Sequence, residues 1–247
     1  MEAVGMTDTG LVRKQNQDAI YSSVTQVGGL PNLFIIADGM GGHKAGDVAS
    51  QQAVARFVQY MTTAEKGSDY VRALLASAHV VNNEVYALAQ ANEDMRGMGT
   101  TFVCCVVEGE RVDIVHVGDS RAYFVTEKGM RQITRDHTYA EELFRAGKIT
   151  AEEARIHPKR HHLTRVLGFD PRVTLDGFSE KLGDAAYLLL CTDGLTNMLD
   201  DAAILGIIRR DDTLHNRVQA LVDTANANGG TDNISAVLID LHGGSKR

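Results

Sequence analysis

Three stretches of the sequence are apolar at every consecutive position, and they restrict the fold more than any other feature. They are LFIIA at Leu33–Ala37, FVCCVV at Phe102–Val107 and YLLLC at Tyr187–Cys191. Successive side chains of a strand point to opposite faces of a sheet, so such strands must be covered on both sides. Two sheets that pack face to face, with helices on their outer faces, satisfy this requirement.

The remaining elements are consistent with an α+β fold. Apolar residues recur at helical spacing over residues 45–61 and 69–91, and further helices are expected from about Asp200 and Thr213. Short turns between neighbouring strands favour antiparallel pairing. We expect the run at residues 102–107 to belong to a strand over residues 97–107, and we expect further strands at residues 2–8, 19–24, 111–118, 120–127, 130–134 and 233–241.

Charge and hydropathy exclude several classes of function. The formal net charge is −7, and no long Lys/Arg run is present, which argues against nucleic acid as a partner. No apolar stretch approaches the roughly 20 residues of a membrane helix, and the N-terminus lacks the pattern of a signal peptide. We therefore expect a cytoplasmic protein with no membrane association.

The sequence contains three cysteines, and all of them lie in apolar runs. This pattern predicts buried thiols and no disulfide framework.

Aspartates stand where several of the apolar strands end or begin. Asp38, Asp119 and Asp193 each follow an apolar run, and Asp232 precedes one. An isolated Asp-Gly pair is usually a turn, but turns do not require so many acids at strand ends. Carboxylates that are clustered in a cleft repel one another unless a cation intervenes, and magnesium or manganese suits oxygen ligands. No histidine or cysteine cluster has zinc spacing. The glycines after Asp38 allow close approach, so Gly39 can offer its main-chain oxygen to a metal.

Arg13 lies in a polar loop, GLVRKQNQD, and two interpretations remain open for it. Its guanidinium can hold two phosphate oxygens in a bidentate arrangement. Alternatively, it is a solvated arginine that pairs with Asp18.

Seven motifs in order carry a resemblance that spans about Met6 to Leu241. The sequence resembles the metal-dependent Ser/Thr protein phosphatases of the type 2C (PPM) family in their compact bacterial form. The resemblance implies a four-layer α-β-β-α sandwich with two antiparallel sheets, formed by residues 1–247 as a single catalytic domain. The motifs are TDTGLVRKQNQD, IIADGMGGHKAG, GMGTT, VHVGDSRAY, ITRDHT, LLLCTDGLTNML and GGTDNISAVLI.

The resemblance also implies a set of metal ligands for two or three Mn²⁺ or Mg²⁺ ions. Asp38 would bridge two ions, and the Gly39 carbonyl would bind the second of them. Asp193 and Asp232 would bind the first, and Asp18 would act through a metal-bound water. The family pattern places a third ion at Asp119, with help from Asp193.

The reaction implied by the resemblance is hydrolysis of phosphoserine and phosphothreonine in proteins by a metal-activated water. Asp38 and Asp193 would serve it as metal ligands and Arg13 would bind the substrate phosphate. The implied partners are phosphorylated proteins, namely Ser/Thr kinases and their substrates, and the expected state is a monomer. Two alternatives are a catalytically silent phosphoprotein-binding module of the same fold and a carboxylate-metal phosphodiesterase or nuclease.

The sequence departs from eukaryotic members of the family at the position after the Asp-Gly pair. Those members have a histidine there that is thought to protonate the leaving group, whereas this chain has Met40. His43 or a metal-bound water can take that role. We predict that His137, His161 and His162 are surface residues rather than catalysts.

Residues from about Thr138 to Gly177 match the variable flap that borders the active site in the family. Bases are concentrated around Lys159–Arg165. A basic flap beside an anionic substrate would recruit phosphopeptides. The alternative is a solvated helical surface without a role in binding.

Overall fold

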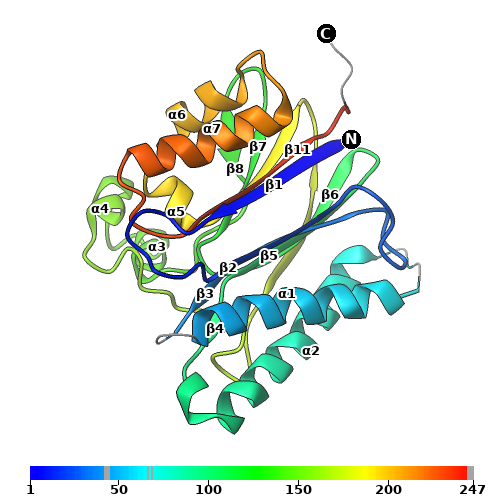
Figure 1. The fold of residues 1–247 in the computed structure, drawn as a ribbon, viewed down its shortest axis with the longest axis vertical. Coiled ribbons are helices and arrows are strands. Elements are labelled where there is room, and N and C mark those ends of the chain that lie inside the picture. The colour runs from blue at the N-terminus through cyan, green and yellow to red at the C-terminus, as the bar shows by residue number, and fades with distance from the viewer. Residues whose placement is uncertain (42–44, 66, 68, 244–247) are drawn as a thin grey trace.

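The computed structural model describes residues 1–41, 45–65, 67 and 69–243 of the protein, and Figure 1 shows their arrangement. His43, a predicted candidate for the leaving-group acid, lies outside the described residues. Within them, no helix combines the length and apolar character that crossing a membrane requires.

Two antiparallel sheets form the centre of the fold. The first sheet has five strands in the order β1 (Glu2–Asp8), β11 (Ile234–Asp240), β10 (Tyr187–Cys191), β7 (Arg121–Val125) and β8 (Met130–Gln132). The second has the order β2 (Asp18–Ser23), β3 (Leu33–Met40), β5 (Phe102–Glu108), β6 (Arg111–Val117) and β9 (Asp176–Lys181), and β4 (Gly99–Thr100) pairs with the end of β3.

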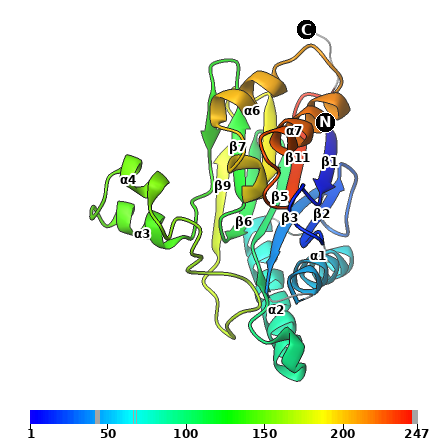
Figure 2. The same ribbon diagram turned by 60° about the vertical axis from the view of Figure 1, so that its left-hand side comes forward.

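Helices cover the outer face of each sheet, which completes four layers (Figure 1). The helices α1 (Ala45–Thr63) and α2 (Tyr70–Ala91) pack on the second sheet, and a short 3-10 turn, η1 (Glu93–Met95), follows α2. The helices α5 (Asp193–Thr196), α6 (Asp201–Ile208) and α7 (Leu214–Ala227) pack on the first. Two short helices, α3 (Tyr139–Arg145) and α4 (Ala151–Ile156), project to one side of the sandwich (Figure 2).

The doubly apolar strands are buried on both faces, as their sequences predict. In β3, Leu33 and Ile35 face the helices α1 and α2, while Phe34 and Ile36 pack between the two sheets. Along β10, residues likewise alternate between the layer under α6 and α7 and the layer between the sheets. Nearly every side chain of these strands therefore loses its contact with water, and this burial stabilises the stack of layers.

The structure confirms the α+β fold with two antiparallel sheets and differs from the predicted elements in detail. The strand β9 was not expected, because its sequence DGFSEK alternates partly buried and exposed positions at the edge of the sheet and contains only one large apolar residue. The short helix α5, which begins two residues after the end of β10, was also missed. The predicted strand over residues 97–107 is interrupted at Thr101. All three cysteines are buried free thiols, as predicted.

Candidate metal centre

Strand ends from both sheets bring the predicted aspartates together. Asp18 begins β2 and lies opposite Asp38 of β3 in the register of the second sheet. Next to the first sheet, Asp193 starts α5 two residues after the end of β10, and Asp232 lies two residues before β11. The charges on these carboxylates act on one another, because each strand holds its acid at the same end of the sandwich.

Asp38 has the most crowded environment of the group. Burial raises its pKa well above the ordinary range, and repulsion from Asp18, Asp193, Asp119 and Asp232 raises it further. All the carboxylates predicted as ligands therefore influence this one side chain. The structure thus groups these acids around Asp38.

Asp18 is held by two hydroxyl groups, one from the residue after β10 and one from β11 of the first sheet. Its Oδ2 accepts hydrogen bonds from Thr192 Oγ1 at 2.9 Å and from Ser235 Oγ at 2.6 Å. Its Oδ1 is buried and has no hydrogen-bond partner among the described residues. Burial raises the pKa of Asp18 to about 7, although the two hydroxyl groups act in the opposite direction. One oxygen is thus fixed and the other is left available for a further ligand.

Main-chain hydrogen bonds from the GMGTT motif fix the end of β3. The Asp38 N–H donates to Thr101 Oγ1 at 2.8 Å, and the Asp38 carbonyl accepts from the Thr101 N–H at 2.8 Å and from Thr100 Oγ1 at 2.9 Å. The next residue, Gly39, packs closely against the first turn of α1, because a β-carbon there would lie 1.9 Å from the carbonyl oxygen of Gly46. A side chain at Gly39 would displace α1 from the site.

Asp193 and Asp119 lie beside an exposed histidine, His161, which sequence reasoning assigned to the surface. Asp193 Oδ2 accepts from Asn197 Nδ2 at 3.0 Å and lies 3.7 Å from His161 Nδ1, while Asp193 Oδ1 is buried without a partner in the described part of the chain. One ligand atom from each of Asp119, His161 and Asp193 lies within 4.8 Å of the others. His161 is therefore exposed, as expected, but it also faces the predicted third-ion position. No spacing in the sequence indicates this approach.

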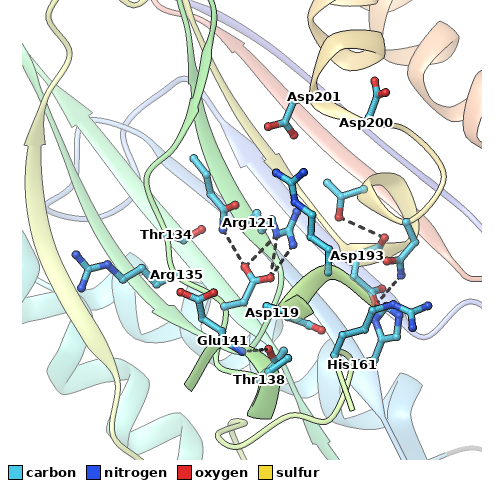
Figure 3. A pocket seen from close by; sticks show the side chains of 18 of the residues that line it. Asp119, Arg121, Thr134, Arg135, Thr138, Glu141, His161, Asp193, Asp200 and Asp201 are labelled. Atoms are coloured by element: carbon cyan, nitrogen blue, oxygen red, sulfur yellow. Dashed lines mark hydrogen bonds and ion pairs between the residues drawn. The ribbon is translucent and has the colours of Figure 1, made fainter. Parts of the chain in front are cut away.

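A large open cavity leads to these residues. Its volume is about 990 Å³, and it lies between the projecting α3–α4 segment and the α5–α6 region. Figure 3 shows His161 beside Asp193 and Asp119 near them, with Arg121 and Arg135 farther along the wall. A substrate can therefore reach the carboxylates from solvent.

Arg13 pairs with Asp232 rather than with Asp18. Its Nη2 lies 2.8 Å from Asp232 Oδ2, and half of its side chain is exposed. The Arg13 guanidinium is also close enough to Asp38 and Asp193 for their charges to raise its pKa, after the larger contribution of the hydrogen bond to Asp232. The exposed part of the guanidinium is open to an anion that approaches the carboxylates.

Asn233, which sequence reasoning did not select, organises the loop that carries Arg13. Its Nδ2 donates to the carbonyls of Thr9 and Gln15 at 2.8 and 2.9 Å, and its Oδ1 accepts from the Gln17 N–H at 2.8 Å. These bonds fix the loop on both sides of Arg13. The only signal in the sequence is the asparagine of the GGTDN motif, which is equally typical of a turn.

The prediction that His137 lies on the surface is wrong. Its side chain is 2% exposed, and its ring lies 4.5 Å from that of the fully buried His116. Burial lowers the pKa of both residues, that of His116 to about 3. His162 is exposed, as expected. The sequence around His137 is polar, so burial there depends on tertiary contacts that local composition does not reveal.

The residues gathered at this site fit a divalent cation. Buried carboxylate oxygens of Asp18 and Asp193 have no hydrogen-bond partner within the described ranges. Burial together with mutual repulsion raises the pKa of these two carboxyls and that of Asp38. A cation would satisfy these oxygens and remove the repulsion. The donors are oxygen atoms, which magnesium and manganese prefer.

Comparison with known proteins agrees with this chemistry. A family model described as protein phosphatase 2C matches residues 12–238. The chain belongs to the protein phosphatase 2C family. A Ser/Thr phosphatase, stp, of Listeria innocua is 37% identical over 97% of this chain and 96% of its own length. Protein phosphatase PhpP of Streptococcus pneumoniae is 36% identical over 98% of each chain.

Solved structures of protein phosphatase 2C relatives have the same fold. The Ser/Thr phosphatase Stp1 from Staphylococcus aureus matches with a TM-score of 0.91 at 36% identity, covering 98% of this chain and 95% of its own. The Mycobacterium tuberculosis phosphatase PstP/Ppp matches with a TM-score of 0.84 at 35% identity, covering 97% and 98%. The family resemblance seen in the seven motifs is therefore confirmed. The family is metal-dependent, in keeping with the acidic cluster.

We expect Asp38→Asn to raise the melting temperature of the metal-free protein at pH 8. The pKa of Asp38 is raised in the fold, so this carboxyl destabilises the folded state at every pH above its ordinary value, and asparagine removes that cost. The expected increase is at least about 2 °C in EDTA, which corresponds to about 1 kcal/mol for a chain of this size. Thermal unfolding followed by circular dichroism measures it.

In the presence of Mn²⁺, the native protein should have a higher melting temperature than the Asp38→Asn variant. Saturating Mn²⁺ should raise the melting temperature of the native protein much more than that of the Asp38→Asn variant, because a ligand that binds the folded state stabilises it. Asp211→Asn, at an exposed acid outside the cavity lining, is the matched control and should behave like the native protein. Equal stabilisation of all three proteins by Mn²⁺ would contradict the assignment of Asp38.

Proposed function

We propose that the protein hydrolyses phosphoserine and phosphothreonine in other proteins. The observation that carries the proposal is the group of buried and partly buried carboxylates around Asp38, with Arg13 at its open side. The relatives that match nearly the whole chain are named Ser/Thr phosphatases, so their names support phosphoproteins as the substrate class. Ser/Thr kinases and their targets, the partners that the sequence predicts, remain part of this proposal.

We assign two or three Mn²⁺ or Mg²⁺ ions to the carboxylates. Asp38, Asp193, Asp232 and the Gly39 carbonyl would hold two of them, and Asp18 would act through water. Asp119, together with Asp193, would hold the third. When bound, such ions supply Lewis-acid chemistry, because they lower the pKa of water and offset the negative charge of a phosphoryl group.

The chain itself positions these groups. The hydroxyls of Thr192 and Ser235 orient Asp18, and Thr101 fixes the main chain at Asp38. Because the acids stand at the ends of strands rather than in free loops, their arrangement is set before a ligand arrives. Preorganised charge of this kind stabilises the transition state of phosphoryl transfer.

Arg13 would bind the phosphate of the substrate. Its ion pair with Asp232 holds the guanidinium at the edge of the carboxylate group, where it remains half exposed. A cation on Asp232 would compete with Arg13 for the same carboxylate and so release guanidinium donors for phosphate oxygens. Arginine suits this role because its donors match two oxygens at once.

The segment of residues 138–177, which includes α3 and α4, would form the substrate flap of a single catalytic domain. It lines the cavity with Arg155, Arg160 and His161. Positive charge there would favour binding of a phosphorylated chain. A monomer suffices for this arrangement, because all the proposed ligands come from one chain. No observation favours the catalytically silent alternative, since every predicted ligand position holds the expected residue.

We expect the protein to release phosphate from a phosphothreonine peptide with Mn²⁺, and EDTA should abolish the reaction. Asp193→Asn should lose activity by about 100-fold or more, because a carboxylate proposed to hold a catalytic ion is removed. Malachite green detection of phosphate measures this loss, and Asp211→Asn is the control. A silent binding module would release no phosphate, and a nuclease would cleave DNA or RNA while sparing the peptide.

Arg13→Ala should lower kcat/KM by about 10- to 100-fold, as expected for the loss of hydrogen bonds to a charged group. Arg13→Lys should recover only part of the loss, because lysine cannot make the bidentate contact. Mn²⁺ should still raise the melting temperature of both variants, because neither lacks a proposed ligand. Native kcat/KM in Arg13→Ala would show that another group binds the phosphate.

A further inference from the structure

His137 stands at a junction outside the carboxylate cluster, at the base of the 138–177 segment. It immediately precedes that segment, and its Nε2 lies 3.1 Å from Oδ2 of Asp176, near the segment's other end. Its Nδ1 accepts a hydrogen bond of 3.1 Å from the main-chain N–H of Gly118. The imidazole ring therefore contacts one end of the segment and the residue before Asp119, while the main chain of His137 continues directly into the other end.

The hydrogen bonds fix where the ring proton lies. Because the Gly118 N–H is a donor, Nδ1 must present its lone pair, so the proton of the neutral ring is on Nε2. The Nε2–H can then donate to the Asp176 carboxylate. Both ring nitrogens therefore take part in hydrogen bonds. Nδ1 accepts from Gly118, and Nε2 donates to Asp176.

Gly118 is confined from two sides, and this confinement sets the position of Asp119. Its φ of +101° is in the region that favours glycine, and a β-carbon there would lie 2.6 Å from the β-carbon of Thr101. On the other side, the His137 N–H donates to the Gly118 carbonyl at 2.9 Å, in addition to the bond at Nδ1. Thr101 itself bonds to Asp38, so the corner before Asp119 is tied to the centre of the site.

Further bonds connect His137 with the interior of the segment. The Thr164 N–H donates to the His137 carbonyl at 2.8 Å. Arg165 Nη1 lies 3.1 Å from Asp176 Oδ1, so the carboxylate that faces His137 also holds a residue of the segment. His161, which faces Asp193, belongs to the same segment. The segment therefore meets the carboxylates at His161 and is anchored at His137.

His116, His137 and Asp176 also place one possible ligand atom each within 4.8 Å of the others. The proton positions argue against a metal there. A metal at Nε2 of His137 would require the proton on Nδ1, where it would meet the N–H of Gly118. Arg165 adds a positive charge beside the one carboxylate of this group. The geometry favours a hydrogen-bonded junction over a cation site.

We propose that His137 is a positioning residue that holds Asp119 through Gly118 and links it to the 138–177 segment through Asp176. Binding of a cation at Asp119 and Asp193, which His161 of the segment faces, and ordering of the segment should then favour each other, since such coupling is reciprocal. This inference rests on the proposed function insofar as Asp119 is assigned a metal-binding role. Substitution of a residue that orients a metal ligand without binding the metal commonly changes metal affinity by 10- to 100-fold.

Two substitutions at His137 separate the roles of its ring nitrogens. The amide oxygen of Asn can take the place of Nδ1, whereas the amide of Gln extends towards Nε2 and does not replace the acceptor for Gly118. Isothermal titration calorimetry of the full chain with MnCl₂ measures the affinities, and Asp119→Asn identifies the site concerned. We expect His137→Gln to weaken that site about tenfold or more, and His137→Asn by less than about threefold. The other Mn²⁺ sites should keep their affinities.

The link to the segment has its own test, which does not depend on variants at His137. Amide hydrogen exchange of residues 138–177 should slow when Mn²⁺ is added to the native protein. Asp176→Ala removes the acceptor of Nε2 at a partly exposed position, and it should largely abolish this slowing while leaving the Gly118 contact in place. His162→Gln, at an exposed histidine of the same segment, is the matched control and should behave as the native protein does.

The outcomes distinguish this inference from the proposed function. Native Mn²⁺ affinity in His137→Gln, or undiminished slowing in Asp176→Ala, would overturn the role of His137 even if the enzyme is an active phosphatase. Absence of a Mn²⁺ site that depends on Asp119 would also overturn it. Mn²⁺ binding with the expected pattern in a protein that releases no phosphate would support the role of His137 and contradict the proposed function.

Discussion

The repulsion among closely grouped, partly or fully buried carboxylates is the constraint that the rest of the structure has to meet. Two sheets bring the ends of their strands to one place, and each end carries an aspartate whose charge acts on Asp38. In a poorly hydrated environment such a group is costly unless its charge is neutralised. The apolar layers that are formed by the doubly buried strands stabilise the fold sufficiently to hold these acids together. A divalent cation that binds these carboxylates would offset their repulsion, so the same arrangement would act as a binding site.

Positioning of the acids comes from residues that do not themselves bind the ion. Thr192, the residue after β10, and Ser235 of β11 hold Asp18 of the second sheet, so the carboxylate joins the two sheets. Asn233 ties the loop of Arg13 to the start of β11. His137 does the same for the corner before Asp119. In each of these pairs, a polar side chain on one element orients an aspartate on another element, or it orients the main chain next to a functional residue there.

The sequence predicted the layers and the grouping of four aspartates at strand ends for a physical reason, whereas the ligand roles and the place of Asp18 among them followed from the family resemblance. A strand that is apolar on both faces can only lie inside a sandwich, and acids at the ends of such strands have few structural uses. The strand β9 escaped prediction because an edge strand needs only alternate burial, and its polar residues resemble those of a loop. Features that depend on contacts between distant segments were also missed, namely the burial of His137, the approach of His161 to Asp193 and the Arg13–Asp232 pair. No local pattern encodes the distance between two such segments.

The most direct test of the account is the position of bound ions. Crystals grown with MnCl₂ and measured at the manganese absorption edge give an anomalous signal for each ion. The account predicts strong peaks among Asp38, Asp193 and Asp232, with Asp38 contacting two ions. A map without a peak between Asp38 and Asp232, from crystals in which these side chains are well ordered, would contradict it.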